Sequence, residues 1–141
     1  MKAEDLMVKA RKAAASARVL LDTGDADGAC NRAYYAMFDA ARAALLSSGA
    51  PVEPEIARTH SGLISAFSLH LVKTGRVPVE LGKALNKVED LRLVADYKGD
   101  PIDPENAAWA VQQAEAFVQA MQVAFVPEPP EDENDNALRP I

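Results

Sequence analysis

The chain has 141 residues, 49% of them hydrophobic and 26% charged, which is the length and composition of one globular domain. Its formal net charge is −6, but the segment from residue 127 onward contains five acids and one base, so most of the imbalance lies there. The near-neutral remainder argues against a general nucleic-acid binder. A single cysteine, Cys30, excludes an internal disulfide and a CxxC metal site.

The sequence also predicts no membrane association. The N-terminus lacks the apolar segment of a signal peptide, and the longest apolar run, 33–46, contains Asp39 and Arg42. We therefore expect a cytoplasmic protein.

The first predicted helix covers residues 2–22. Its apolar residues recur at alternating spacings of four and three, which is typical of an amphipathic helix: Leu6, Ala10, Ala13, Ala17 and Leu20. Gly24 suits the left-handed position after this helix, and Asp25 suits the N-cap of the next. The connection is short, so the first two helices should be antiparallel neighbours.

The second predicted helix, 26–46, is apolar on nearly all sides, which indicates a central helix packed against several neighbours. Four polar residues interrupt it at spacings of four, four and three, and so form one seam: Asn31, Tyr35, Asp39 and Arg42. The seam is interpreted either as a polar ladder that fixes packing or as one wall of a cleft or subunit interface.

Three further helices follow. We expect the third from residue 55 or 59 to 74, the fourth over 79–97 with Pro78 at its first position, and the fifth after Asp103 as N-cap and Pro104. No segment alternates with a period of two. The sequence thus predicts an all-α, up-and-down bundle of about five helices over residues 1–126. Residues 127–141 form an acidic, proline-rich segment that we expect to be disordered.

Arg92 is the residue that this pattern explains least well. It falls about 20° from the middle of the fourth helix's apolar stripe, and a buried charge needs a partner. One interpretation is a local ion pair with Asp96, one turn later. The other is an arginine that projects into a cleft and binds phosphate.

Three segments resemble HEPN (higher eukaryotes and prokaryotes nucleotide-binding) domains, in the same order. They are 31–38 (NRAYYAMF), 59–67 (THSGLISAF) and 90–97 (DLRLVADY), and the resemblance extends over residues 3–125. It implies a helical bundle that forms a homodimer with its motif in a cleft between subunits. It also implies a minimal nucleotidyltransferase as partner, as in toxin–antitoxin pairs.

Many HEPN proteins are metal-independent ribonucleases with an Arg-x(4–6)-His motif, so the resemblance implies no cofactor. Here Arg92 matches the arginine, but Tyr97 stands at the histidine position. A tyrosine is protonated at neutral pH and is a poor general base, although it could donate a proton, orient a phosphate or accept a nucleotide. His60, near the start of the third helix, is the alternative proton carrier.

These residues define the predicted site. The catalytic candidates are Arg92, Tyr97 and His60, and the supporting residues are Asn31, Arg32, Tyr35, Asp39 and Asp96. Arg92 and Tyr97 differ by about 140° in helical phase. They can therefore converge only if the helix ends before Tyr97 or if one of them comes from the second subunit.

Three functional alternatives remain open. The first is an RNA-cleaving, toxin-like protein in which Arg92 stabilises the scissile phosphate. The second is a non-catalytic dimer that binds a nucleotide or a protein and acts with a nucleotidyltransferase. The third is a structural scaffold without a ligand.

Overall fold

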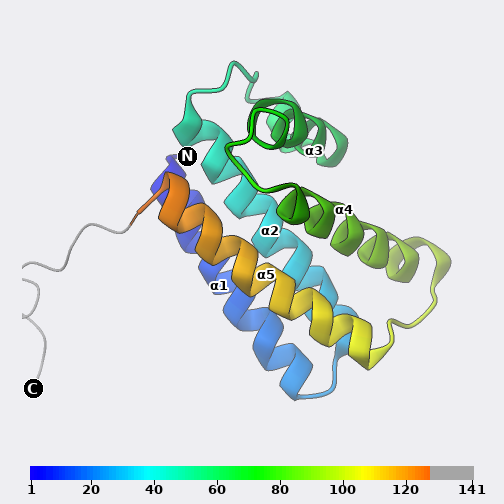
Figure 1. Cartoon of the computed structure of the whole chain (residues 1–141). Coiled ribbons are helices and arrows are strands. Elements are labelled where there is room, and N and C mark those ends of the chain that lie inside the picture. The colour runs from blue at the N-terminus through cyan, green and yellow to red at the C-terminus, as the bar shows by residue number, and fades with distance from the viewer. Residues whose placement is uncertain (128–141) are drawn as a thin grey trace, which may run out of the picture.

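The computed structural model describes residues 1–127, which form a bundle of helices and contain no strand (Figure 1). The all-α prediction is confirmed. The α-helices are α1 (Ala3–Asp22), α2 (Ala26–Ser48), α3 (His60–Phe67), α4 (Val79–Leu93) and α5 (Pro104–Phe125). The segment predicted to be disordered, 127–141, lies almost wholly outside the described residues.

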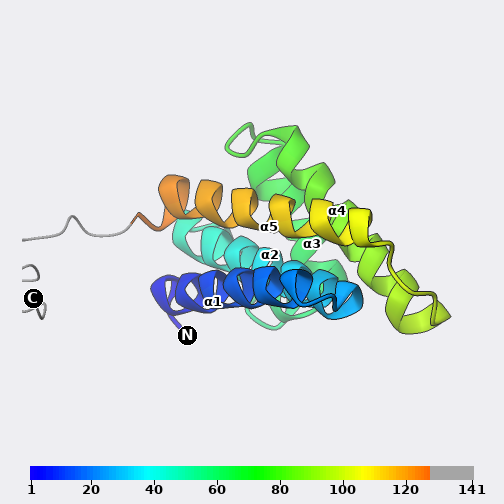
Figure 2. The ribbon, with the colours of Figure 1, turned by 90° about the horizontal axis from the view of Figure 1, so that it is seen from below.

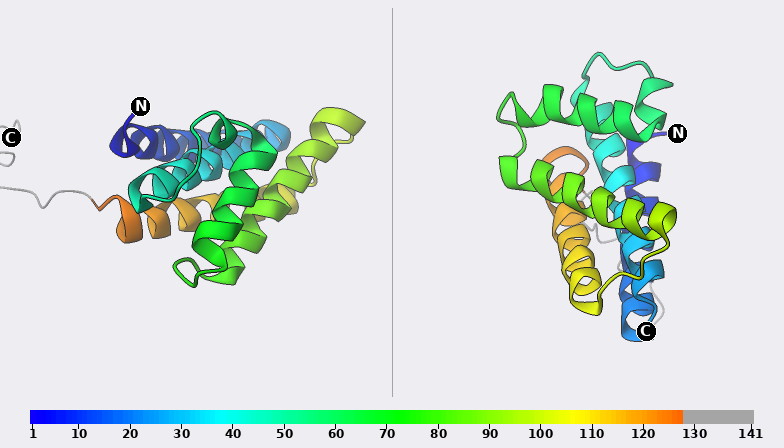
Figure 3. Two further views of the ribbon diagram at one scale, coloured as in Figure 1. Left: turned by 90° about the horizontal axis from the view of Figure 1, so that it is seen from above. Right: turned by 90° about the vertical axis from the view of Figure 1, so that its right-hand side faces the viewer.

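The helices are arranged in two parts. α1, α2 and α5 lie side by side, and each packs against the other two (Figures 1 and 2). α2 and α5 run in the same direction and α1 runs in the opposite one, so the N-terminus and the end of α5 lie at the same end (Figure 1). α3 and α4 form a hairpin that crosses this three-helix part obliquely and contacts α2 (Figure 3).

The prediction of a buried central helix is confirmed by α2. Thirteen of its 23 residues are buried. An alanine stripe lines one side, at spacings that place it opposite Tyr34 and Phe38: Ala29, Ala33, Ala36 and Ala40. Small side chains allow neighbouring helices to approach closely, and α1 and α5 also contribute alanines to the core.

Capping residues set the helix ends much as the sequence predicts. The Asp25 side chain accepts a hydrogen bond from the Gly28 backbone N–H (2.9 Å), and Asp103 does the same for Glu105 (2.7 Å). Gly24 has a φ of 91°, which only glycine adopts without strain. The sequence predicts Pro78 at the first helical position of the fourth helix. In the structure Pro78 is the N-cap of α4, and Val79 is the first helical residue.

The third and fourth predicted helices are less regular than expected. The third comprises a 3₁₀ turn, η1 (Ile56–Arg58), then α3 and a π-helical turn, η2 (Ser68–Val72). The fourth continues beyond α4 as a second π-helical turn, η3 (Val94–Lys98). Single π turns depend on tertiary packing and leave no clear sequence pattern.

Among residues 1–127, no helix is both long enough and apolar enough to cross a membrane. The prediction of a cytoplasmic location is not tested further and stays a prediction.

Candidate functional site

Arg92 lies on the face of α4 that packs against α2, where only 7% of the residue is exposed. Its guanidinium carbon is 4.7 Å from the centre of the Tyr34 ring and 5.9 Å from that of Tyr35. A planar guanidinium stacks favourably on an aromatic face, a contact worth about 0.5–2 kcal/mol. The aromatic side of α2 thus provides the surface on which Arg92 rests.

Arg92 has one charged partner in the described residues. Its Nη1 donates to Asp96 Oδ2 at 2.8 Å, so the ion pair that is one of the two sequence-based interpretations of Arg92 is present. The Asp96 side chain is 43% exposed, and solvent therefore weakens this pair. The Nε–H of Arg92 is buried and has no hydrogen-bond partner within residues 1–127. Unpaired buried donors are rare, so Arg92 is an unusual residue in the apolar part of the bundle.

A second polar group lies beside the arginine and was not predicted from the sequence. The hydroxyl of Tyr34, a fully buried residue, is 2.6 Å from Nδ1 of His60 and donates to Oε2 of Glu89 at 2.8 Å. Burial, followed by the hydrogen bond to Glu89, raises the pKa of Tyr34 well above its ordinary value, so the phenol keeps its proton. Tyr34 therefore connects α2 to both helices of the α3–α4 hairpin.

The signal for this network is present in the sequence, although it is weak. Tyr34 falls on the apolar side of α2, yet a buried phenol needs a hydrogen-bond partner. Glu89 precedes Arg92 by three residues and shares its side of α4. Neither observation identifies His60 as the third member, because it is 26 residues from Tyr34 along the chain.

His60 is held in place by the start of α3. Thr59 is the N-cap and accepts from the Gly62 N–H at 3.0 Å. A Cβ atom on Gly62 would lie 2.3 Å from the Ile56 carbonyl oxygen, so only glycine fits there. The His60 ring also contacts the rings of Tyr34, Tyr35 and Phe38 at centroid distances of 5.2–6.0 Å. The predicted candidate His60 thus lies within the same aromatic cluster as Arg92.

Tyr97 lies apart from this cluster. The residue is 81% exposed, and within the described residues no hydrogen bond or ring contact joins it to Arg92. The helical turn η3 continues through Lys98, so the helix does not end before Tyr97, and Tyr97 does not turn back toward Arg92.

The polar seam of α2 is divided between two surroundings. Tyr35 belongs to the aromatic cluster. Arg32 is exposed beside Ser16 and Val19 of α1, away from Arg92, and Asn31 is half-buried. Burial raises the pKa of Asp39, and the positive charges of Lys9, Arg42 and Arg32 partly offset this effect.

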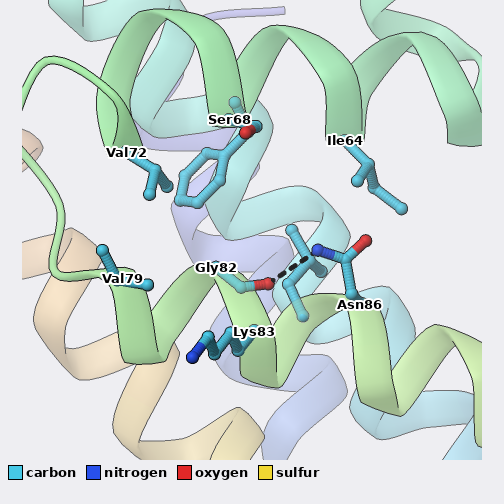
Figure 4. Close-up of a pocket in the computed structure, with 9 residues that line it drawn as sticks. Ile64, Ser68, Val72, Val79, Gly82, Lys83 and Asn86 are labelled. Atoms are coloured by element: carbon cyan, nitrogen blue, oxygen red, sulfur yellow. Dashed lines mark hydrogen bonds between the residues drawn. The ribbon is translucent and has the colours of Figure 1, made fainter.

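Two other features complete the description. A cleft of about 150 Å³ opens between the α3–η2 segment and α4, where Asn86 donates to the Gly82 carbonyl (Figure 4). Its lining is largely apolar and includes none of the predicted site residues. Within residues 1–127, no three His, Cys, Asp or Glu side chains are grouped so that they could hold a metal ion.

Comparison with known proteins identifies the class to which this fold belongs. Residues 3–124 match the family model of the HEPN domain, and the chain belongs to this family. UPF0332 protein glr0978 of Gloeobacter violaceus is 36% identical over 118 residues, which is 82% of this chain and 90% of that protein.

Two other relatives are of comparable similarity. A UPF0332 protein of Thermotoga maritima is 35% identical over 116 residues, covering 81% of this chain and 83% of its own. The Methanocaldococcus jannaschii protein named "Putative toxin MJ0605" is 33% identical over 110 residues, or 78% of each chain.

Proposed function

We propose that this HEPN protein is the toxin-like member of a toxin–antitoxin pair and that it binds an RNA or nucleotide phosphate at Arg92. The toxin name of the Methanocaldococcus relative supports the first part. The observation that carries the second part is the orientation of the Arg92 guanidinium, whose face rests on Tyr34 and whose one charged partner, Asp96, is partly exposed. A guanidinium held in one orientation is well suited to bind phosphate oxygens.

The proposed reaction is metal-independent cleavage of RNA. His60 removes the proton of a ribose 2′-hydroxyl, whose oxygen attacks the adjacent phosphorus and displaces the 5′-oxygen of the next nucleotide. Arg92 stabilises the negative charge that builds up on the phosphate oxygens. Tyr97 is exposed and separate from Arg92 within one protomer, so its donation of a proton to the leaving oxygen requires the second subunit of the proposed homodimer.

The first experiment measures cleavage of RNA by the purified protein in the presence of a chelator. We expect cleavage by the wild type and by Arg58→Ala, which removes an exposed arginine outside the site, and a loss of at least 100-fold in Arg92→Ala. Equal cleavage by Arg92→Ala would refute the assignment of Arg92.

The alternative is a non-catalytic dimeric module that binds a nucleotide or a protein and acts with a nucleotidyltransferase. The exposure of Tyr97 favours it, because a phenol at the surface is accessible to an enzyme that attaches a nucleotide. Absence of cleavage by folded wild-type dimer over a range of RNAs would support this alternative.

A nucleotidyltransferase encoded next to this chain is the proposed partner in both cases. Co-purification of the two proteins tests the partnership. An increase in the mass of this chain by one or more nucleotides, present with wild type and absent with Tyr97→Phe, would identify Tyr97 as the acceptor. A modified Tyr97→Phe protein would exclude it.

A further inference from the structure

The network around Tyr34 determines more than packing. The Tyr34 hydroxyl has one hydrogen, and its bond to Oε2 of Glu89 at 2.8 Å needs that hydrogen when Glu89 acts as the acceptor. A carboxylate accepts hydrogen bonds and donates none. The short contact of 2.6 Å between the same hydroxyl oxygen and Nδ1 of His60 must therefore use a hydrogen that the imidazole supplies. It follows that Nδ1 of His60 carries the proton.

We propose that Glu89 and Tyr34 together fix His60 as its Nδ1–H tautomer, so that Nε2 is the nitrogen that accepts a proton at this site. Tyr34 and Glu89 are positioning residues in this proposal, because neither touches the ligand. The tautomer follows from the two contacts of the Tyr34 hydroxyl with Glu89 as the acceptor in one of them. Its consequence for proton transfer rests on the proposed function, in which His60 is the base.

The location of His60 relative to Arg92 supports a shared task. The His60 ring centre is 6.0 Å from the centre of the Tyr35 ring, and the Arg92 guanidinium carbon is 5.9 Å from that same centre. Both side chains also contact Tyr34. A phosphate bound by Arg92 would thus lie against the same aromatic cluster that holds the imidazole.

The network also has a defined response when Nε2 takes up a proton. The proton moves from the ribose 2′-oxygen to Nε2, and the electron pair stays on that oxygen. The imidazolium keeps its Nδ1–H bond to the Tyr34 oxygen, and the Tyr34 hydroxyl keeps its hydrogen and still donates it to the Glu89 carboxylate. The carboxylate thereby stabilises the positive charge through the phenol, as a carboxylate does when it is bonded directly to a catalytic imidazole.

Nitrogen NMR of the histidine rings tests the tautomer without any RNA. The chain has two histidines, so a His70→Gln variant leaves the signals of His60 alone. We expect a protonated Nδ1 and an unprotonated Nε2 in the neutral ring of the otherwise wild-type protein. A protonated Nε2 would overturn the proposal, and this result does not depend on whether the protein cleaves RNA.

Two substitutions then separate the network from general packing. Tyr34→Phe keeps the ring and removes the hydroxyl, so we expect the ring of His60 to shift toward the Nε2–H form. Tyr35→Phe is the matched control for the tautomer, because the Tyr35 ring also contacts His60 but makes no hydrogen bond with it. An unchanged tautomer in Tyr34→Phe would overturn the proposal. If this variant does not fold, Glu89→Leu provides the same comparison.

The catalytic consequence has its own measurement. In an RNA-cleaving wild type, Tyr34→Phe should lower kcat by roughly 10–100-fold and leave KM nearly unchanged, as expected for a group that orients a histidine. If the wild type has the Nδ1–H tautomer but Tyr34→Phe has an unchanged kcat, the network has only a structural role, and this part of the proposal is refuted. Absence of cleavage by the wild type would instead refute the proposed function and leave the tautomer assignment intact.

Discussion

The Arg92 guanidinium carbon lies 4.7 Å from the centre of the Tyr34 ring, and the hydroxyl of that ring joins His60 to Glu89. One buried tyrosine therefore supports the cation with its face and two titratable residues with its edge. This arrangement links Arg92, the predicted phosphate-binding residue, to His60, the predicted proton carrier. The effect of Arg92 on stability and its effect on phosphate binding can be measured separately.

Arg92→Met should remove phosphate binding with little change in stability. Methionine fills a similar volume, and loss of the contact with Tyr34 is offset by relief from burying a charge. We expect the free energy of unfolding to change by less than about 1 kcal/mol in urea denaturation. Asp96, which loses its partner, is 43% side-chain exposed and remains hydrated. A loss above about 3 kcal/mol would mean that Arg92 is retained for stability.

Tyr34→Phe should destabilise the protein in a pH-dependent manner. Loss of both hydrogen bonds should cost about 1–3 kcal/mol at neutral pH. The folded state raises the pKa of Tyr34, so this contribution is fully present below the unfolded tyrosine pKa, about 10, and is lost as pH rises further. The difference between wild type and Tyr34→Phe should thus shrink above pH ~10 in chemical denaturation.

Tyr97→Phe is the control for that experiment. It removes the hydroxyl of an exposed tyrosine, so its stability should follow that of the wild type across the same pH range. A constant difference between wild type and Tyr34→Phe up to pH ~12 would contradict the prediction.

Asp39→Asn should stabilise the protein at neutral pH. Burial raises the pKa of Asp39 above its unfolded value, so the protonated form is favoured in the folded state. The contribution of Asp39 to stability is therefore fully present below the pKa of the unfolded state. It is lost as the pH rises through the higher pKa of the folded state. The advantage of Asp39→Asn should therefore be larger at pH 7 than at about pH 4, as measured by urea denaturation at each pH. An equal advantage at both values would exclude a role for ionisation.

Gly62→Ala should disturb the start of α3 and with it His60. The new Cβ would lie 2.3 Å from the Ile56 carbonyl oxygen and 2.4 Å from Thr59 Oγ1, which is the N-cap acceptor. We expect a loss of roughly 2 kcal/mol or more in thermal or urea unfolding. Gly82→Ala is the matched control in α4, where the nearest atom is a Val72 methyl carbon at 3.1 Å and alanine favours the helix. Equal losses in both variants would contradict this explanation.

Cys30 should be unreactive in the folded protein. The residue is fully buried, and burial, aided by Asp27, raises its pKa to about 11. Because the thiolate is the reactive form, a thiol reagent at pH 7.5 should label Cys30 only as fast as the protein unfolds. Rapid labelling of the folded protein would show that α2 opens locally around this residue.

The helices could be predicted well because their ends carry strong local signals. Asp25 and Asp103 cap the helices that the sequence assigns to them, and the predicted span 26–46 falls within Ala26–Ser48. The π turns η2 and η3 could not be predicted, since they depend on contacts between helices rather than on residue type.

The site could be predicted only in part. Helical phase identified Arg92 as buried, and the ion pair with Asp96 followed from a spacing of four residues. Helical phase places Tyr34 on an apolar side of α2 and gives no sign of its partners, because His60 and Glu89 lie 26 and 55 residues away. Periodicity assigns a residue to a side of a helix, but it does not identify what lies opposite.

The two sides of α2 carry side chains of very different size. Opposite its alanine stripe, a helix can approach until the backbones are nearly in contact, and no space remains for a polar side chain. On the other side, the rings of Tyr34, Tyr35 and Phe38 stand between α2 and the α3–α4 hairpin, where they contact His60 and Arg92. Bulky aromatic residues thus act as spacers, and the interval they maintain is what accommodates a guanidinium, an imidazole and a carboxylate inside an otherwise apolar bundle.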